Sequence, residues 1–440
     1  MEVTTTASRK VINGWAMYDW ANSAYNLVVT STIFPAYYDA ITTNNINGVV
    51  SHEVSFLGFK IESAALYNYA IAFAYLVIAI ISPILSSIAD YKGNKKTFMK
   101  FFCYLGGTAC ITLFKFDASH LSLGIICCIL AAIGYCGSLV FYNAYLPEIA
   151  AEKDQDSVSA KGFAYGYIGS VLLQLICFVF VMAKPFGISG GLAAQISFML
   201  VGLWWIGFAQ ITFARLPKGT PIGNDLQHSL LVNGFHELKK VLEQVKMLPL
   251  LKKYLTSFFF YSMGVQTVML AATLFGSQVL KLDTSKLIIC ILLIQIVAIA
   301  GAYLMAKLSD LFGNFKVLMF VVVIWIGVCI AAYYTTTEIQ FYAIASIVGL
   351  VMGGIQSLSR STYAKIMPAT KDTASFFSFY DVTEKIAIVI GMFSFGFIQQ
   401  LTGNMRNSII ALVAFFFIGL IFLFFTQKQQ DKYNILNVEG

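Results

Sequence analysis

Long apolar stretches separated by short polar connections run through the whole sequence. Each stretch is close to the ~20 residues that a helix needs to cross the hydrocarbon core of a bilayer. Twelve of them lie at residues 13–38, 64–87, 97–116, 121–146, 161–183, 192–214, 254–279, 286–308, 316–335, 339–366, 375–400 and 407–426. This pattern predicts an all-α integral membrane protein with 12 transmembrane helices.

A polar stretch at 215–253 divides the chain into two apolar parts, 1–214 and 254–440. Each part holds six of the apolar stretches, which predicts two six-helix bundles joined by a linker. Apolar residues at helical spacing indicate an amphipathic helix within the linker: Phe235, Leu238, Leu242 and Val245. Such a helix lies either on the inner leaflet of the membrane or in solvent between the bundles, and the sequence fits both.

One short motif occurs once in each half. Asp90-Tyr-Lys-Gly-Asn-Lys-Lys96 and Asp310-Leu-Phe-Gly-Asn-Phe-Lys316 share the pattern D-x-x-G-N-x-K, and each copy follows a long apolar stretch. Pro147 and Pro368 keep nearly the same spacing between the halves. Parallel repeats of this size are typical of transporters whose two bundles rock around a central site. The repeat therefore favours a carrier over a membrane receptor or a membrane enzyme.

The positive charges are distributed unevenly along the chain. Of the 29 lysines and arginines, most fall in connections on one side of the predicted membrane, and Lys385 lies within a span. The opposite side holds only Lys60, Lys115, Lys184, Lys281, Lys286 and Arg406. Cytoplasmic loops carry the excess of lysine and arginine in membrane proteins, so both termini are predicted to be cytoplasmic. The net charge of +7 then reflects topology, and no nucleic-acid partner is expected.

Residues that hold metals or bind ATP are missing from the predicted spans. The four histidines, His52, His120, His228 and His236, all fall in predicted loops. Without histidine in the spans, no intramembrane metal centre or histidine-based catalytic set can be assembled. The G-x-x-x-x-G-K-[ST] phosphate loop is absent too. The sequence therefore predicts no metal, no cofactor and no enzymatic activity, and energy for transport would come from an ion or solute gradient.

The first apolar stretch carries a stripe of polar residues. Along one helical face lie Asp19, Asn22, Ser23, Asn26 and Thr30. Polar side chains are costly in hydrocarbon and usually face a bundle interior or an aqueous cavity. The stripe is predicted to line a cavity, although asparagine and serine also join neighbouring helices by hydrogen bonds.

The tenth and eleventh stretches hold further charges. Arg360 presents a fork that suits a carboxylate, and its alternative role is an ion pair with Asp381 or Glu384. Asp381 and Lys385 are four residues apart and can pair on one helix face. Asp19 has only amides and hydroxyls beside it in the sequence, so it is the predicted proton-coupling carboxylate. Glu384, next to Asp381 and Lys385, is predicted to be a fixed member of an ion-pair group.

These residues define a predicted substrate site between the first, fourth, seventh and tenth spans. Its members are polar groups near the middle of the membrane: Asp19, Asn22, Ser23, Asn26, Tyr142, Asn143, Gln266, Gln356, Arg360 and Tyr363. The predicted coupling residues are Asp19, Asp381, Glu384 and Lys385. Whether a proton is coupled at all, or the protein is a uniporter, stays open at this point.

The repeated loop resembles a known sequence. Ser86-Ser-Ile-Ala-Asp90-Tyr-Lys-Gly-Asn-Lys-Lys96 is similar to the signature G-x-x-x-D-R-x-G-R-[RK] of the major facilitator superfamily. Asp90, Gly93 and the final lysines match, whereas Ser86, Tyr91 and Asn94 depart from the signature. Tyr91 replaces an arginine, and Lys92 is the expected substitute for its charge.

The resemblance implies that these loops gate the cytoplasmic side. Asp90 and Asp310 are expected to cap the starts of the eleventh and fifth spans, where the positive end of a helix favours a carboxylate. The other expected gating residues are Lys92, Lys96, Glu148, Lys161 and Lys316.

Further motifs resemble one branch of this superfamily, the vacuole effluxers, typified by a fungal autophagy-linked exporter of amino acids. They are Tyr18-Asp-Trp-Ala-Asn-Ser-Ala-Tyr25, Phe141-Tyr-Asn-Ala-Tyr-Leu-Pro-Glu-Ile-Ala150, Lys161-Gly-Phe-Ala-Tyr-Gly-Tyr-Ile168, Ser359-Arg-Ser-Thr-Tyr-Ala-Lys365 and Phe376-Phe-Ser-Phe-Tyr380. The resemblance implies efflux of a small polar solute, such as an amino acid, by a monomer in the inner membrane's lipid bilayer, with protons as the candidate coupling ion. A sugar-like or drug-like substrate remains the alternative.

Overall fold

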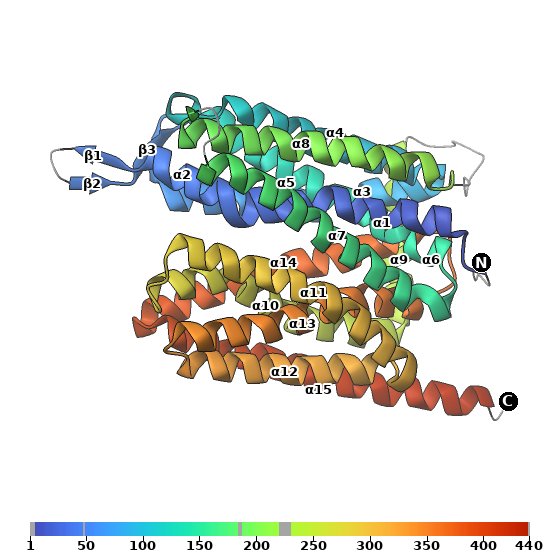
Figure 1. Ribbon diagram of the computed structural model, residues 1–440. Coiled ribbons are helices and arrows are strands. Elements are labelled where there is room, and N and C mark those ends of the chain that lie inside the picture. Colours follow the sequence, from blue (N-terminus) through green and yellow to red (C-terminus); the bar gives the residue numbers. More distant parts are fainter. Residues whose placement is uncertain (1–4, 47–48, 184–186, 220–229, 439–440) are drawn as a thin grey trace.

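The structure of the chain, a computed structural model, describes residues 5–46, 49–183, 187–219 and 230–438. Most of these residues are helical, and the helices form two groups that lie side by side (Figure 1). Both ends of the chain lie on the same side of the molecule, which we call the terminus side (Figure 1). The charge distribution predicts that this side is cytoplasmic.

The first group contains eight of the helices. They are α1 (Arg9–Ala24), α2 (Phe34–Thr42), α3 (Ser63–Lys92), α4 (Lys95–Thr112), α5 (Leu121–Ala144), α6 (Leu146–Ile149), α7 (Gln155–Phe178) and α8 (Gly190–Arg215). A π-helical segment, Tyr25–Ile33, joins α1 to α2, and a second one, Val179–Ala183, follows α7. Trp205 is fully buried in this group, against Tyr25 and Tyr135.

The second group begins after a connecting helix. That helix is α9 (Leu230–Met247), and the group comprises α10 (Pro249–Gln278), α11 (Thr284–Phe312), α12 (Asn314–Tyr334), α13 (Glu338–Ile366), α14 (Thr373–Thr402) and α15 (Met405–Val438). Its fully buried tryptophan, Trp325, stacks on Phe416. Each group thus has a buried tryptophan packed against other aromatic rings.

Most helices begin and end within about six residues of the predicted apolar stretches, whereas α15 continues well past residue 426, to Val438. Among the described residues, ten helices are long and apolar enough to cross a membrane. The two predicted spans outside this set are the first, which the π-helical segment divides, and the eleventh, α14, which carries three charges. Twelve crossings and cytoplasmic termini therefore stay predictions, while the all-helical membrane architecture is confirmed.

Two small hairpins interrupt the helical fold and were not expected from the sequence. β1 (Asn44–Ile46) pairs with β2 (Val49–Ser51), and β3 (Glu53–Phe56) pairs with β4 (Phe59–Glu62). The second hairpin turns through Leu57 and Gly58, both with positive φ, as a two-residue hairpin turn requires. Leucine is rare in that conformation, so the turn carries little sequence signal.

The repeated motif connects two pairs of antiparallel helices, as its position after an apolar stretch predicted. Gly93 ends α3 in the left-handed conformation, with φ 63°, and Gly313 separates α11 from α12 with φ 85°. Residues with a Cβ atom rarely adopt these angles, so glycine allows the sharp reversal in both copies.

The predicted amphipathic helix of the linker is α9, and it packs against α3. Val241 and Val245 are buried, whereas Leu242 is 38% exposed. The buried face is therefore rotated from the predicted apolar face, which included Leu242 and left out Val241. The side chain of Phe235 lies outside the described residues. α9 thus attaches the linker to the first bundle.

α11 and α13 pack very closely through glycines. A Cβ atom on Gly301 would lie 2.0 Å from the Leu350 carbonyl oxygen, and one on Gly353 would lie 2.1 Å from that of Ala298. Small residues are what allow two membrane helices to approach to this distance.

Gly353→Ala is therefore expected to destabilise the protein, by about 1–3 kcal/mol, because backbone must move to admit the methyl group. Thermal unfolding in detergent measures the effect. Gly396→Ala is the matched control, since nothing lies within 4 Å of its added Cβ. Equal unfolding temperatures for the two variants would contradict the close packing.

Candidate functional site: a polar cavity between the bundles

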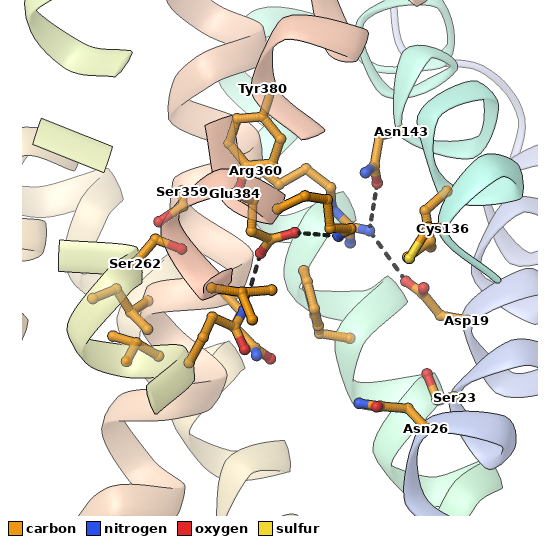
Figure 2. Close-up of a pocket in the computed structure, with 18 of the residues that line it drawn as sticks. Asp19, Ser23, Asn26, Cys136, Asn143, Ser262, Ser359, Arg360, Tyr380 and Glu384 are labelled. Carbon is orange, nitrogen blue, oxygen red and sulfur yellow. Dashed lines mark hydrogen bonds and ion pairs between the residues drawn. The ribbon is translucent and has the colours of Figure 1, made fainter. Parts of the chain in front are cut away.

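A polar cavity of about 180 Å³ lies between the two groups of helices. Its wall combines residues of α1, α5 and α7 with residues of α10, α13 and α14 (Figure 2). The sequence prediction named nine of the polar residues that line it: Asp19, Ser23, Asn26, Asn143, Gln266, Gln356, Arg360, Glu384 and Lys385. It missed the lining residues Ser170, Ser262, Gln295 and Ser359.

Arg360 belongs to α13 of the second bundle, yet the first bundle holds its guanidinium. Nη1 donates to Asp19 Oδ2 at 3.3 Å and to Asn143 Oδ1 at 3.2 Å. Nε and Nη2 donate to the hydroxyl and the carbonyl of Ser159, at 3.0 and 2.8 Å. The guanidinium also lies 4.2 Å from the centre of the Phe163 ring. Arg360 is thus a buried link between the bundles, and the alternative of a pair with Asp381 or Glu384 is wrong.

Asp19 is the carboxylate partner of this link. Besides Arg360, it accepts a hydrogen bond of 2.7 Å from the Tyr142 hydroxyl, and its residue is 5% exposed. The sequence suggested that Asp19 has no cation nearby, which is wrong, because its cation arrives from the other half of the chain. Charges so far apart in sequence give no local signal of pairing.

A second charged group lies on α14. Lys385 Nζ is 3.2 Å from Asp381 Oδ1 and 2.9 Å from Glu384 Oε2. Glu384 also accepts a hydrogen bond of 3.0 Å from Gln266 of α10. The predicted pairing of Asp381 with Lys385 on one helix face is confirmed. Asp381 Oδ2 is buried and has no hydrogen-bond partner among the described residues.

Three of the predicted substrate residues do not line the cavity. Asn22 is 1% exposed and accepts a hydrogen bond from the Ser23 hydroxyl. Tyr142 lies behind Asp19 and stacks on Trp15 at 4.5 Å. Tyr363 donates to the Phe376 carbonyl at 2.6 Å, a contact within the second bundle. Helix periodicity identified the polar face of α1 but not which of its residues reach the open space.

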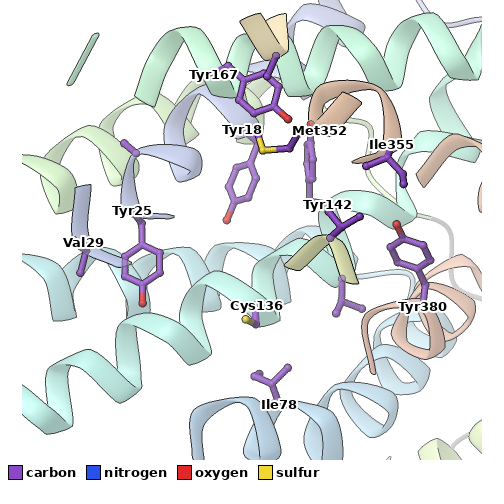
Figure 3. Close-up of a cluster of buried hydrophobic side chains, with 14 of the residues drawn as sticks. Tyr18, Tyr25, Val29, Ile78, Cys136, Tyr142, Tyr167, Met352, Ile355 and Tyr380 are labelled. Atoms are coloured by element: carbon purple, nitrogen blue, oxygen red, sulfur yellow. The ribbon is translucent and has the colours of Figure 1, made fainter. Parts of the chain in front are cut away.

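Several tyrosines belong to a cluster of buried side chains, among them Tyr142, Tyr167 and Tyr380 (Figure 3). Tyr167 of α7 donates to Gln356 Oε1 of α13 at 2.7 Å, which makes a further contact between the bundles. Tyr380 of α14 stacks on Phe258 at 4.2 Å, and both line the cavity. These rings give the cavity apolar walls around a few fixed charges, a common composition for small-molecule sites.

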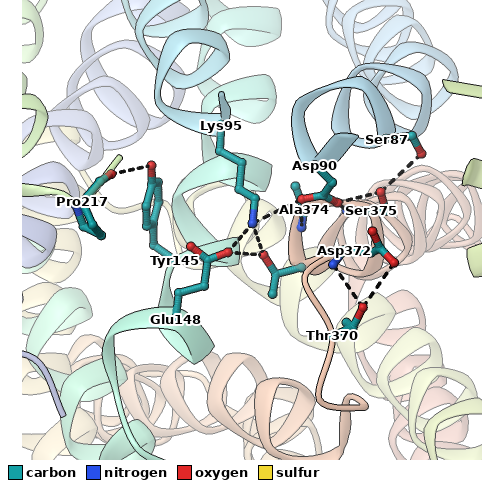
Figure 4. A network of polar contacts seen from close by, with 11 residues as sticks. Ser87, Asp90, Lys95, Tyr145, Glu148, Pro217, Thr370, Asp372, Ala374 and Ser375 are labelled. Atoms are coloured by element: carbon teal, nitrogen blue, oxygen red, sulfur yellow. Dashed lines mark hydrogen bonds and ion pairs between the residues drawn. The ribbon is translucent and has the colours of Figure 1, made fainter. Parts of the chain in front are cut away.

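The first copy of the repeated motif joins the bundles on the terminus side (Figure 4). Asp90 accepts hydrogen bonds from the backbone N–H groups of Ala374 and Ser375, at 3.2 and 2.7 Å, and one from the Ser375 hydroxyl. These N–H groups belong to the first turn of α14, so Asp90 caps the eleventh span, as predicted.

Lys95 supplies the positive charge of this network. Its ammonium lies 3.2 Å from Asp90 and contacts both Glu148 and Thr373. Thr373 in turn donates to Glu148 at 2.7 Å. Lys92, the expected substitute, is exposed and makes no ion pair in the described part of the chain. The helix reverses at Gly93, so a residue of α4, and not of α3, faces the carboxylates.

The second copy of the motif works differently. Asp310 is exposed, so the prediction that it caps the fifth span is wrong. The carboxylate at this place is Asp156, in the first turn of α7. It accepts hydrogen bonds from Ser309 (2.9 Å) and Asn314 (2.7 Å) and pairs with Lys365 at 2.5 Å. The acid lies in the first bundle and its partners lie in the second.

The other predicted gating residues do not bridge the bundles. Lys161 donates to Asn13, and Lys96 donates to the backbone carbonyls of Phe213 and Leu216, all within the first half. Lys316 is exposed. The contacts between the bundles described above lie on the terminus side, at Asp90 and Asp156, and near the middle of the helices, at Arg360.

Comparisons with known proteins agree with this architecture. Residues 7–435 match the family described as vacuole effluxer Atg22 like. The chain is 32% identical over 420 residues to the MFS-type transporter YxiO of Bacillus subtilis (strain 168), covering 95% of both chains. It is 24% identical over 488 residues to autophagy-related protein 22 of Eremothecium gossypii, covering 99% of this chain and 92% of that protein. The solved major facilitator proton:xylose symporter XylE is similar in fold, with a TM-score of 0.71 at 13% identity over 94% of each chain.

Proposed function

Because the chain belongs to the vacuole effluxer Atg22-like family of major facilitator transporters, we propose that it exports a small zwitterionic solute, an amino acid, by alternating access. It acts as a monomer in the inner membrane, and a proton gradient drives it. The networks around Asp90 and Asp156 join the bundles on the side that the predicted orientation places in the cytoplasm, which supports an outward-facing state of the cycle. The units that move are the proposed bundles 1–214 and 254–440, with 215–253 as the linker.

The charges of the cavity carry this proposal. Asp19 pairs with Arg360 and Glu384 pairs with Lys385, and all four residues line the cavity. An amino acid presents an ammonium and a carboxylate, which complement the acid and the base of such pairs. A neutral sugar needs no such fixed charges, and it is therefore the less favoured substrate.

The same charges support coupling to a proton. Three carboxylates, Asp19, Asp381 and Glu384, lie with only two cations, Arg360 and Lys385. An unbalanced charge inside a membrane protein is costly. The group therefore favours one more positive charge, which a proton or the ammonium of the substrate supplies. Competition between these two for the same carboxylates gives antiport, the exchange that export against a gradient requires.

Proteoliposomes containing the purified protein test the proposal. Labelled amino acids and labelled sugars are compared, each with and without a pH gradient. Accumulation of an amino acid that follows the pH gradient is the expected result. Transport of sugars alone, or transport indifferent to the gradient, would replace the proposal with a sugar facilitator or a uniporter of the same fold.

Asn26→Ala and Gln266→Ala are expected to weaken apparent substrate affinity, because each residue lines the cavity from a different bundle. Loss of one hydrogen bond of about 0.5–1.5 kcal/mol corresponds to a two- to tenfold rise in the apparent KM. Asn22→Ala serves as the comparison, since Asn22 is buried outside the cavity lining. A lower yield of all three proteins with unchanged KM would instead favour a role in joining helices.

A further inference from the structure

A basic hollow lies outside the transport path, where α10 and α15 meet on the terminus side. It has a volume of about 400 Å³ and is lined by Lys253, Phe425, Lys428, Gln429, Lys432 and Tyr433. Lys428 and Lys432 are one helical turn apart on α15, and Lys253 faces them from the first turns of α10. Three lysines thus line one space together with two aromatic residues.

Among the residues that the structure describes, none of the three lysines that line this hollow forms an ion pair. The nearby acid on α15, Asp431, accepts a hydrogen bond from Gln427 at 2.7 Å. Gln429 Oε1 is buried and has no hydrogen-bond partner among the described residues. The hollow therefore offers positive charge and one free acceptor to a ligand.

An apolar track leads from the membrane to the hollow. Phe417, Ile421 and Phe424 follow one another at helical spacing on α15 and are 56%, 40% and 56% exposed. Phe425, one residue further, is 48% exposed and also lines the hollow. Exposed rings on a membrane helix face lipid, and aromatic residues next to lysine are typical of the boundary between acyl chains and headgroups.

We propose that the hollow binds the headgroup of an anionic phospholipid, with an acyl chain along Phe417, Ile421 and Phe424. The lysines contact the phosphate, as basic pockets between membrane helices do. A hydroxyl of a glycerol headgroup donates to Gln429 Oε1. Free phosphate would make no contact with exposed phenylalanine, so the continuous apolar track favours a lipid over free phosphate. A lipid at this position would hold α10 and α15 together at the membrane surface.

Binding of phosphatidylglycerol to the purified full-length protein in detergent tests this inference, with phosphatidylcholine as the neutral lipid. The variant Lys253→Gln/Lys428→Gln/Lys432→Gln removes the basic group. The control Lys10→Gln/Lys239→Gln/Lys307→Gln removes three exposed lysines elsewhere on the terminus side, with the same change of net charge. Native mass spectrometry reports bound lipid and shows whether each variant is folded.

The hollow variant is expected to bind phosphatidylglycerol about fivefold more weakly for each lysine removed, the change that about 1 kcal/mol per lysine gives. The control should bind as the wild type does. Equal loss in both variants would mean general charge attraction and would overturn the site. If inorganic phosphate competes as well as lipid does, and Phe424→Ser leaves lipid affinity unchanged, the hollow is a site for free phosphate. That result would overturn the lipid proposal.

Discussion

Asp19→Asn is expected to abolish gradient-driven accumulation of substrate while exchange across the membrane continues. In the structure Asp19 pairs with Arg360 of the other bundle at 3.3 Å, and both residues are almost fully buried. The pair exists while Asp19 is deprotonated, and it is lost when the carboxylate takes a proton. Protonation would therefore release the bundles from each other, and asparagine fixes the released state.

The pH dependence of exchange separates this role from simple binding. In the wild type, the pair is lost as pH falls, so exchange should become faster toward low pH. In Asp19→Asn, the rate should no longer depend on pH, because the group that takes the proton is gone. If the exchange rate responds to pH equally in both proteins, Asp19 is not the coupling residue, and Asp381 or Glu384 takes that role.

A double-mutant cycle measures the pair directly. Arg360→Gln alone leaves Asp19 buried without its cation, a loss of about 3–5 kcal/mol in comparable buried pairs. Adding Asp19→Asn should restore much of the stability, because no uncompensated charge remains. Additive losses in thermal unfolding would mean that Arg360 acts through Ser159 and the aromatic rings and not through Asp19.

The sequence predicted the helices well because their signal is local. Twenty apolar residues in a row, the turn at Gly93 and the cap of α14 by Asp90 each follow from neighbours in the chain or from the family motif. The polar stripe on α1 was equally visible. The prediction for this stripe was only partly right, since Ser23 and Asn26 line the cavity while Asn22 is buried outside its lining.

Contacts between the bundles could not be predicted from the sequence. Arg360 pairs with Asp19, and Lys365 pairs with Asp156, although the partners are hundreds of residues apart in sequence. Which residues meet depends on the rotation of whole helices, and periodicity gives only the face of a single helix. The same limit explains why Lys95 was overlooked, since its direction depends on the turn at Gly93.

The repeat also gave a wrong prediction for Asp310, because symmetry of the fold does not require the same charged contacts in both halves. Asp90 and Asp310 occupy equivalent positions, yet only Asp90 contacts the opposite bundle. On the other side Asn314, a residue of the same motif, bonds to Asp156. Both interfaces place a carboxylate at the start of a helix, where the positive helix end stabilises it. In one interface the acid, Asp90, comes from α3 of the opposite bundle, and in the other the acid, Asp156, belongs to the first turn of α7 itself.

Because of this difference, Asp310 serves as the control for Asp90. Asp90→Asn is expected to shift the protein toward the state that is open on the terminus side, because it weakens the cap of α14 and the pair with Lys95. A combined loss of about 1.4 kcal/mol changes the ratio of the two states about tenfold. Asp310→Asn changes the same motif in the same way at an exposed position, so it should leave the ratio unchanged.

A cysteine at Ala306 reports the opening. Ala306 is 4% exposed and packs with Ala160 and Ala302 between α7 and α11, so a thiol there reacts only when the bundles separate. The native cysteines are all buried, which keeps background labelling low. Labelling of Ala306→Cys by a membrane-impermeant maleimide should be about tenfold faster with Asp90→Asn and unchanged with Asp310→Asn. Asp156→Asn should act like Asp90→Asn, because it breaks the second network beside the reporter. Equal labelling of all four proteins would leave these carboxylates with a role in membrane topology alone.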